Sequence, residues 1–216
     1  IMSSKYVIFD LDDTLVYEID YLKSAYRAIA SLVVSEAVAT ERLYKQMICE
    51  YQEGRNAFEY VAKYFPLFSM EQLLQVYRNH FPVISLNEGA QEVLVFCKAQ
   101  GYKIGLITDG RSVTQRNKLR ALGIEALFDK IVISEEFGRS KPALHNYEVF
   151  TEEDIKAYCY IGDNPTKDFI APNILGWTSY CLLNKGWNIH PQDFEVAPEQ
   201  QPTYIITELK ELIHTL

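Results

Sequence analysis

Five short apolar segments, separated by helical ones, restrict the folds open to this chain. Each has the length and composition of a buried β-strand, and they cover residues 6–9, 103–108, 130–133, 158–161 and 178–183. Residues at helical spacing precede the second segment, namely Ala90, Val93, Leu94 and Cys97. Strands that alternate with helices pair in parallel through right-handed crossovers. The sequence therefore predicts an α/β fold, a doubly wound parallel sheet covered on both faces, with a last strand–helix pair at residues 204–214.

A long helical region interrupts this alternation after the first strand. From about residue 17 to about residue 77 the chain is rich in Ala, Leu, Tyr, Glu and Lys, and it has no alternating strand pattern. Breaks near residues 39–40, 53–54 and 65–66 predict three or four antiparallel helices. We therefore expect a helical insertion between the first strand and the rest of the sheet.

The charge and the apolar content narrow the possible partners. The 216 residues contain 21 Lys and Arg against 29 Asp and Glu, which gives a net charge of −8. This charge repels a polyanionic backbone, so we do not expect nucleic acid as a partner. A small phosphorylated metabolite stays possible, because a local cationic site can outweigh the global field at short range. The longest apolar runs, such as residues 28–34, are far shorter than the roughly 20 residues that cross a membrane, so no membrane span is expected.

The cysteines and the first residues bear on the cellular compartment. The four cysteines lie far apart and form no C-x-x-C pair; they are Cys49, Cys97, Cys159 and Cys181. This pattern argues against a zinc site and against a disulfide framework. The first residues lead directly into an apolar strand and show no basic flank with a cleavage site. A cytoplasmic location is therefore expected.

Polar residues follow several predicted strands at the point where each strand ends. They are Asp10 and Asp12, Thr108, Lys141, and Asp163 with Asp168 beyond it. In a doubly wound sheet these ends share one edge, where ligands bind. Each residue alone could be ordinary: a turn acid, a helix-end acid, a surface lysine or a common hydroxyl. Together, in this order, they predict a functional site.

The same residues resemble the four signatures of the haloacid dehalogenase superfamily. The matching segments are FDLDDTL, ITDG, SKP and IGDNPTKD, and they span nearly all of the predicted sheet. The resemblance implies a Rossmann-like catalytic core made of residues 1–15 and 86–216. It also implies an α-helical cap at residues 16–85, which would determine substrate specificity.

The resemblance implies phosphoryl chemistry at Asp10. Relatives that cleave carbon–halogen bonds usually lack an acid two residues after the nucleophile, whereas phosphatases and phosphomutases have an Asp there, as at Asp12. Asp10 would attack phosphorus to form an aspartyl-phosphate, and Asp12 would protonate the leaving alkoxide and then activate water. A carboxylate about 4 Å from a phosphoryl oxygen is repelled by roughly 4 kcal/mol at an effective dielectric near 20, so other groups must offset this charge.

The remaining signatures would supply the groups that offset the negative charge of Asp10. The resemblance implies an Mg²⁺ ion held by Asp10, the main-chain carbonyl of Asp12, Asp163 and Asp168. It implies phosphate binding by Thr108, by the main chain around Asp109 and by Lys141. The expected reaction is hydrolysis of a small phosphomonoester of the sugar phosphate or nucleotide class. A phosphomutase, or a non-catalytic module on the same fold, is the alternative.

Smaller expectations concern the segments around the site. Asp13 is expected to cap the following segment, and the hydroxyl of Thr14 could orient the acidic loop. Asn164 followed by Pro165 predicts a helix start, with Asp168 in the first turn. The helix before the fourth strand is expected to be short. Residues 188–202 are expected to form an extended surface loop, and the four histidines show no metal-ligand spacing.

Overall fold

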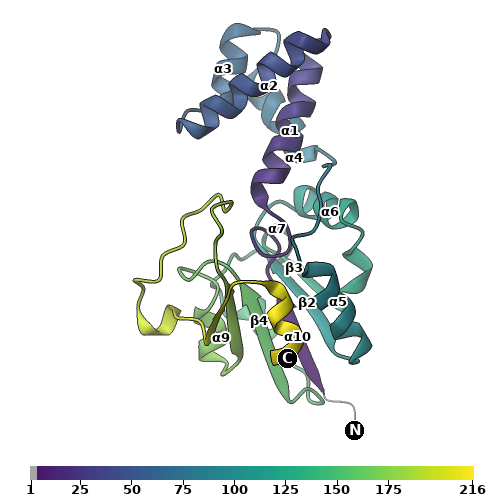
Figure 1. Cartoon of the computed structure of the whole chain (residues 1–216), viewed down its shortest axis with the longest axis vertical. Coiled ribbons are helices and arrows are strands. Elements are labelled where there is room, and N and C mark those ends of the chain that lie inside the picture. Colours follow the sequence, from purple (N-terminus) through teal and green to yellow (C-terminus); the bar gives the residue numbers. More distant parts are fainter. Residues whose placement is uncertain (1–3) are drawn as a thin grey trace.

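The computed structural model describes residues 4–216 and contains one six-stranded sheet in which every pairing is parallel. The strands run in the order β3-β2-β1-β4-β5-β6. Their bounds are β1 Lys5–Phe9, β2 Lys103–Thr108, β3 Lys130–Ile133, β4 Ala157–Gly162, β5 Thr178–Leu182 and β6 Tyr204–Ile206. Each of the first five lies within one residue of its predicted ends. The predicted doubly wound α/β fold is therefore confirmed (Figure 1).

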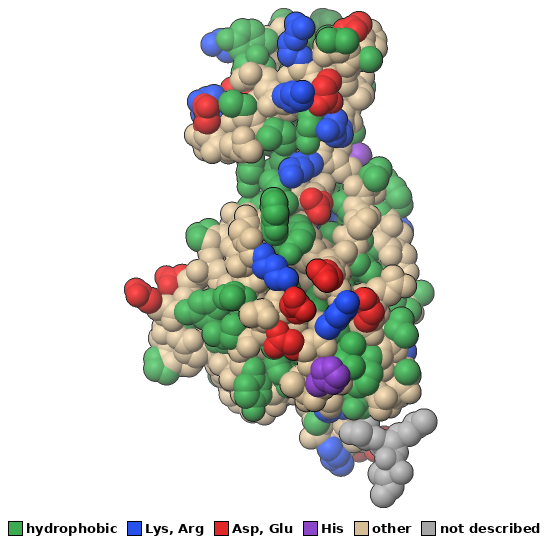
Figure 2. All heavy atoms as spheres, in the orientation of Figure 1, with side chains coloured by type: hydrophobic (Ala, Val, Ile, Leu, Met, Phe, Trp, Pro, Cys, Tyr) green, Lys and Arg blue, Asp and Glu red, His purple; other side chains and the backbone are tan. Residues whose placement is uncertain are grey.

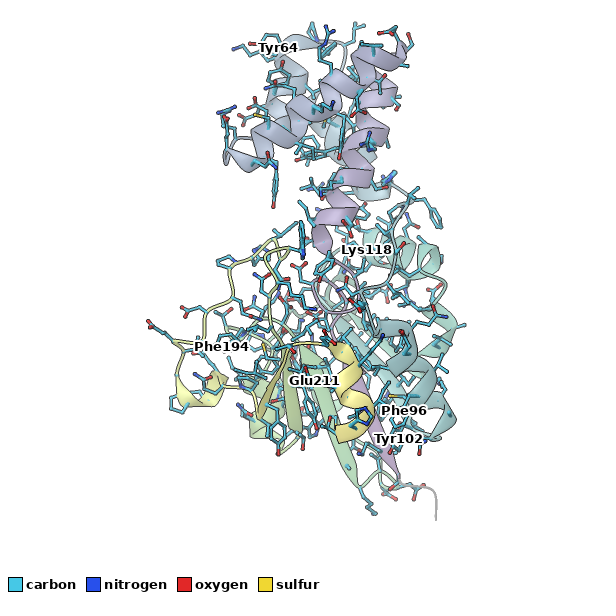
Figure 3. The ribbon with its side chains drawn as sticks, viewed as in Figure 1. Tyr64, Phe96, Tyr102, Lys118, Phe194 and Glu211 are labelled. Carbon is cyan, nitrogen blue, oxygen red and sulfur yellow. The ribbon has the colours of Figure 1, made fainter. Side chains whose placement is uncertain are left out.

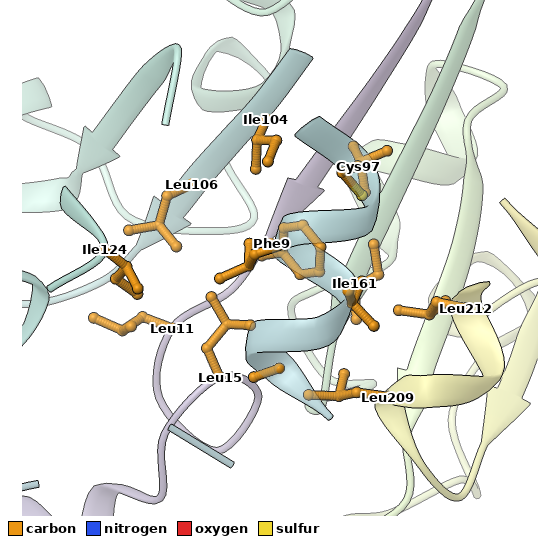
Figure 4. Close-up of a cluster of buried hydrophobic side chains, with 14 of the residues drawn as sticks. Phe9, Leu11, Leu15, Cys97, Ile104, Leu106, Ile124, Ile161, Leu209 and Leu212 are labelled. Atoms are coloured by element: carbon orange, nitrogen blue, oxygen red, sulfur yellow. The ribbon is translucent and has the colours of Figure 1, made fainter. Parts of the chain in front are cut away.

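Alternating side chains of the strands fill two separate cores, one on each face of the sheet. On β1, Val7 and Phe9 point into the first core, and Tyr6 and Ile8 point into the second. Helices α5 (Ala90–Ala99), α6 (Ser112–Ala121) and α10 (Leu212–Thr215) cover the first face (Figure 4). The short helices α7 (Ser134–Phe137), α8 (His145–Glu148) and α9 (Ile170–Ile174) lie with the second face. Because the strands are buried on both faces, they appear in the sequence as continuous apolar runs.

Four helices between β1 and β2 form a lobe of their own. They are α1 (Glu18–Val33), α2 (Ala37–Gln52), α3 (Ala57–Tyr64) and α4 (Met70–Asn79), and we call them the helical lobe. Ile29, Met47, Val61 and Leu73 are fully buried in its apolar core. The lobe lies beyond one end of the sheet, joined to the body by a narrower waist, and the start of β1 lies near the opposite end (Figures 1 and 2).

The ends of these helices follow local capping. Predicted breaks at residues 53–54 and 65–66 are confirmed, but the break at residues 39–40 is wrong, because α2 runs through it. Glu36 caps α2 instead, since its carboxylate accepts hydrogen bonds from the amides of Val38 (3.0 Å) and Ala39 (2.7 Å). Ser69 and Gln72 form a reciprocal capping box at the start of α4.

Two further predictions concern the helices. The helix before β4 is short as expected, since α8 has four residues. Within the described residues 4–216, no helix combines the length and apolar character that a membrane crossing needs.

Candidate active site

The carboxyl edge of the sheet brings Asp10 and Lys141 together. The main chain of Asp10 continues the ladder beyond β1, because its amide donates to the carbonyl of Ile161 at 2.8 Å. The ammonium Nζ of Lys141 lies 3.0 Å from Asp10 Oδ1 and 2.8 Å from Asp168 Oδ1. The Lys141 side chain is 1% exposed. Such a buried ammonium is stable only when carboxylates surround it, so the three side chains form one charged unit.

The loop after β4 places two more acids at this edge. Asp168 is fully buried, and its Oδ2 accepts the amides of Asp163 (3.1 Å) and Asn164 (2.9 Å). A Cβ on Gly162 would lie 2.6 Å from this same oxygen, so only glycine lets the loop close around Asp168. The predicted helix start at Asn164 is confirmed for a single turn only. Asn164 Oδ1 accepts the amide of Thr166 (3.0 Å), the amide of Asp168 donates to the carbonyl of Asn164 (2.9 Å), and α9 begins at Ile170. Asp168 therefore lies in this turn, and its carboxylate binds the two amides that precede the turn.

The acids form a group that suits a cation. Asp10, Asp163 and Asp168 each offer a carboxylate oxygen, and these oxygens lie within 4.8 Å of one another. Burial first, then the nearby Asp168 and Asp10 charges, raise the pKa of Asp163 to about 9. Burial also raises the pKa of Asp10 to about 7, although Lys141 opposes the rise. Three buried carboxylates with one lysine leave excess negative charge, which a hard divalent cation with oxygen ligands would offset.

Buried leucines and two main-chain hydrogen bonds fix the acidic loop that follows Asp10. Leu11 and Leu15 are fully buried in the first core. Asp13 has a positive φ of 59°, and its carboxylate accepts the amides of Glu18 (3.0 Å) and Ile189 (3.1 Å). Asp13 therefore caps the start of α1, as predicted. The prediction for Thr14 is wrong, since its buried hydroxyl has no hydrogen-bond partner in the described part of the chain.

Asp12 is not part of the three-acid group, and helix α6 binds its carboxylate. Its Oδ1 lies 2.7 Å from Lys118 Nζ, and its Oδ2 accepts a hydrogen bond from Gln115 Nε2 at 2.8 Å. Its side chain is 19% exposed and borders the same pocket as Asp10. A carboxylate at the pocket wall is placed to exchange a proton with a bound substrate.

The predicted phosphate-binding residues come from the end of β2 and from the loop after β3. Thr108 ends β2, is buried, and accepts a hydrogen bond from Gln115 Nε2 at 2.6 Å. Asp109 accepts the amide of Lys141 (3.0 Å) and pairs with Lys167 (3.2 Å). All three predicted residues line one pocket with Asp10.

This pocket is small and mostly polar. Its volume is about 240 Å³, and it is lined by Asp10, Asp12, Asp13, Glu18, Thr108, Asp109, Gly110, Lys141, Asp163, Asn164, Lys167 and His190. Ligand pockets for drug-sized molecules usually begin at about 300 Å³. The space therefore fits a small molecule that binds through charge and hydrogen bonds.

Sequence reasoning missed several members of the site. Gln115 and Lys118 lie on the buried face of α6, next to Leu119. Glu18 begins α1 and lines the pocket. Lys167 lies in the loop after β4. No pattern in the sequence distinguishes these polar residues from ordinary surface ones.

The loop after β5 takes a larger part in the site than the sequence predicts. Residues 188–202 are not only a surface loop, because the first part folds back onto the site. Asn188 Nδ2 donates to Asp163 Oδ2 at 3.1 Å, and Gln192 Nε2 donates to the carbonyl of Asp163 at 2.6 Å. His190 is exposed but lines the pocket. This segment therefore adds contacts to Asp163 beyond those within its own loop.

A doubly wound sheet with carboxylates and a buried lysine at its carboxyl edge defines an α/β enzyme whose ligands bind beyond the strand ends. The family model described as haloacid dehalogenase-like hydrolase matches residues 7–179. The chain belongs to this family, as the four sequence signatures indicated.

Two curated relatives are phosphatases, and a solved structure has the same fold. The glyceraldehyde 3-phosphate phosphatase of Methanocaldococcus jannaschii is 28% identical over 97% of this chain and 95% of its own length. The pyrimidine 5′-nucleotidase YjjG of Escherichia coli is 31% identical, over 51% of this chain and 48% of its own length. A putative beta-phosphoglucomutase from Thermotoga maritima has the same fold, with a TM-score of 0.67, 20% identity, and 98% and 97% of the two chains covered. The chain is a phosphatase-type member of the family.

Proposed function

We propose that the chain is an Mg²⁺-dependent phosphohydrolase that cleaves a small phosphomonoester through an aspartyl-phosphate on Asp10. The single observation that carries the proposal is the convergence of four charged residues at one edge of the sheet, where Asp10, Lys141 and Asp163 line the pocket and Asp168 is buried beside them. A buried carboxylate beside an ammonium and a group of cation-binding acids can approach a phosphoryl group that a free carboxylate would repel.

The residues divide the reaction into two steps. In the first, Asp10 forms a bond to phosphorus, the ester P–O bond breaks, and the Asp12 carboxylic acid gives its proton to the departing alkoxide. In the second, water attacks phosphorus, Asp12 takes a proton from it, and the bond between phosphorus and Asp10 breaks. The products are an alcohol and phosphate, and both aspartates return to their starting states.

The other groups would hold the phosphoryl oxygens and balance charge. Thr108 would donate its hydroxyl, the main chain around Asp109 its amides, and Lys141 its positive charge. The residues present suit Mg²⁺, since Asp10, Asp163 and Asp168 offer clustered carboxylate oxygens and Asp12 can add its main-chain carbonyl. When bound there, Mg²⁺ would neutralise the acids and polarise the phosphoryl group.

The size of the pocket and the relatives together favour a sugar phosphate over a nucleotide. A cavity of about 240 Å³ suits a short carbon chain better than a base and a ribose. The near full-length relatives include a glyceraldehyde 3-phosphate phosphatase, so this compound is the first substrate to test. We further propose that residues 1–15 and 86–216 are the catalytic core and that residues 16–85 are a cap that selects the substrate.

An Asp10→Asn variant tests the proposal. We expect its release of phosphate from glyceraldehyde 3-phosphate to fall by roughly 10³-fold or more, because the nucleophile is lost. Acid quench of the wild type with a ³²P-labelled substrate should show hydroxylamine-sensitive label on the protein, and the variant should show none. Asp154→Asn, an exposed acid before β4, is the matched control. Undiminished turnover in Asp10→Asn would remove Asp10 from the mechanism.

A further inference from the structure

We infer that Lys118 and Gln115 are positioning residues for Asp12. They hold its carboxylate at a fixed place and orientation on the pocket wall, where it transfers the proton to the leaving group. This inference rests on the proposed function, because it gives Asp12 the role of the acid. It adds two residues of α6 that none of the four signatures contains.

Each oxygen of the Asp12 carboxylate has its own partner on α6. Lys118 Nζ binds Oδ1 at 2.7 Å, and Gln115 Nε2 binds Oδ2 at 2.8 Å. Residues three apart on a helix lie on the same face, so α6 presents both groups to one carboxylate. With one partner on each oxygen, the carboxylate has little freedom to rotate. Its orientation is therefore set by α6 and not by the loop that carries it.

The burial of Lys118 supports a functional reason for the residue. Its side chain is 3% exposed, and its ammonium lies 4.8 Å from the ring centre of Tyr21. A buried ammonium costs several kcal/mol unless it is paired, and an apolar side chain would serve packing at least as well. Lys118 forms an ion pair with Asp12, just as Lys141 forms one with Asp10.

Gln115 joins Asp12 to the predicted phosphate-binding hydroxyl. Its Nε2 carries two hydrogens, which it can donate to Asp12 Oδ2 and to Thr108 Oγ1 at 2.6 Å. The Thr108 oxygen then acts as acceptor towards Gln115, so its own hydrogen stays available for a phosphoryl oxygen. One amide therefore fixes the distance between the proton donor and the phosphate-binding group.

The same helix also anchors the segment that returns from the helical lobe. Thr114 Oγ1 donates to the carbonyl of Arg78 at 2.8 Å, and Asn117 Nδ2 donates to the carbonyls of Asn79 (3.2 Å) and His80 (3.3 Å). Figure 3 shows Lys118 beside the lower end of α1, between the lobe and the body. The position of Asp12 is therefore tied to the place where the lobe joins the body.

The test compares two leaving groups in a Lys118→Met variant. An alkoxide leaves slowly without a proton, whereas p-nitrophenolate leaves without one, so only the first depends on a well-placed acid. We expect the first-turnover rate with glycerol 3-phosphate to fall by roughly 10²-fold, within the usual range for an acid catalyst. The first-turnover burst of p-nitrophenol from p-nitrophenyl phosphate should fall far less. KM for both substrates should change little, since Lys118 does not line the pocket.

The controls separate this inference from the proposed function and from misfolding. Lys98→Met removes an exposed lysine that pairs with Asp129 and should behave as wild type. Lys118→Gln keeps a hydrogen-bond donor, and it should recover part of the glycerol 3-phosphate rate; it also serves if Lys118→Met fails to fold. If Asp10→Asn is inactive but both Lys118 variants lower the two first-turnover rates equally, the inference is wrong and the proposed function stands. If Asp10→Asn stays active, both are wrong.

Discussion

The edge of the sheet and the helical lobe use charged residues in opposite ways. At the edge, Asp10, Lys141 and Asp168 are almost completely buried and bind one another. In the lobe, ion pairs lie on the surface, as between Lys45 and Glu41, and the cluster of packed side chains in its interior is apolar. Buried charges are costly and surface pairs contribute little. The sheet edge therefore buries charges at a cost in stability, as the proposed catalysis requires, whereas the lobe follows the ordinary rules of helix packing.

The two regions also contribute unequally to the pocket. Of the residues that line it, the core supplies all except Glu18, which begins α1. Red and blue side chains lie near one another on the body below the waist, as Figure 2 shows for one face. If the lobe selects the substrate as proposed, Glu18 is the residue through which it acts in this arrangement.

The largest expected effect comes from removing a cation in each region. Lys141→Met should lower the free energy of unfolding at pH 8 by roughly 3–5 kcal/mol, because it leaves Asp10 and Asp168 buried beside each other without their partner. Lys45→Met should cost at most about 1 kcal/mol, since the side chains of Lys45 and of its partner Glu41 are 74% and 44% exposed. Urea denaturation without Mg²⁺ measures both values.

The comparison between the regions depends on how much the two variants differ in their loss of unfolding free energy. Near-equal losses would show that burial does not distinguish the charges at the edge from those in the lobe. A double variant should lose the sum of the two free energies, because the sites lie in separate regions.

Mg²⁺ and pH are expected to have a smaller effect on the stability of the protein. The pKa of Asp163 is raised from 3.8 to about 9, so between these values the folded, metal-free protein holds more protons than the unfolded chain. Its stability therefore falls as the pH rises through this window. Mg²⁺ would bind the deprotonated acids and should raise Tm by roughly 5–10 °C at about 100 times its Kd, with a larger shift at pH 8 than at pH 6.

Calorimetry with and without Mg²⁺ at the two pH values provides the measurement. In Asp163→Asn the Mg²⁺ shift should shrink and the metal-free Tm should depend less on pH. If Mg²⁺ shifts Tm equally at both pH values, the metal does not bind at carboxylates whose pKa values are raised. The lobe offers no comparable group of buried acids among its described residues, so the effect belongs to the sheet edge.

The sequence predicted the sheet well because its strands are buried on both faces. Continuous apolar runs such as residues 103–108 are too short for a typical helix and too apolar for a surface loop, and the polar residues directly after them had to lie at one edge. The start of α2 was misplaced because Glu36 caps it with a side chain that rarely serves there. The helix expected after Asn164 extends for one turn only, and Asp168 in that turn binds the amides of Asp163 and Asn164.

The missed members of the site have a common physical reason. Gln115 and Lys118 are typical residues of an exposed helix surface, and their function depends on Asp12, more than a hundred positions away in the chain. Ile189 contributes a main-chain amide to Asp13, which almost any residue could supply. Such contacts depend on tertiary packing, and residue type carries no trace of them.

The smallest expected effect tests whether the lobe selects substrates through Glu18. Burial first, then the charge of Asp12, raise the pKa of Glu18 to about 7, so its carboxylate is mostly ionised at pH 8 and mostly protonated at pH 6. An ionised Glu18 repels a second anionic group on the substrate by about 1 kcal/mol at several Å in an intermediate dielectric. Glu18→Gln should therefore raise kcat/KM for phosphoglycolate relative to glycerol 3-phosphate by about fivefold at pH 8.

The pH dependence separates this effect from a change in packing. At pH 6 the wild-type Glu18 already carries a proton, so the ratio of the two kcat/KM values should be nearly the same in wild type and Glu18→Gln. Glu59→Gln, an exposed acid on α3, should leave the ratio unchanged at both pH values. If Glu18→Gln shifts the ratio equally at pH 6 and pH 8, charge is not the cause. If it shifts the ratio at neither, the core alone selects the substrate, and the contrast between the two regions extends to specificity as well as chemistry.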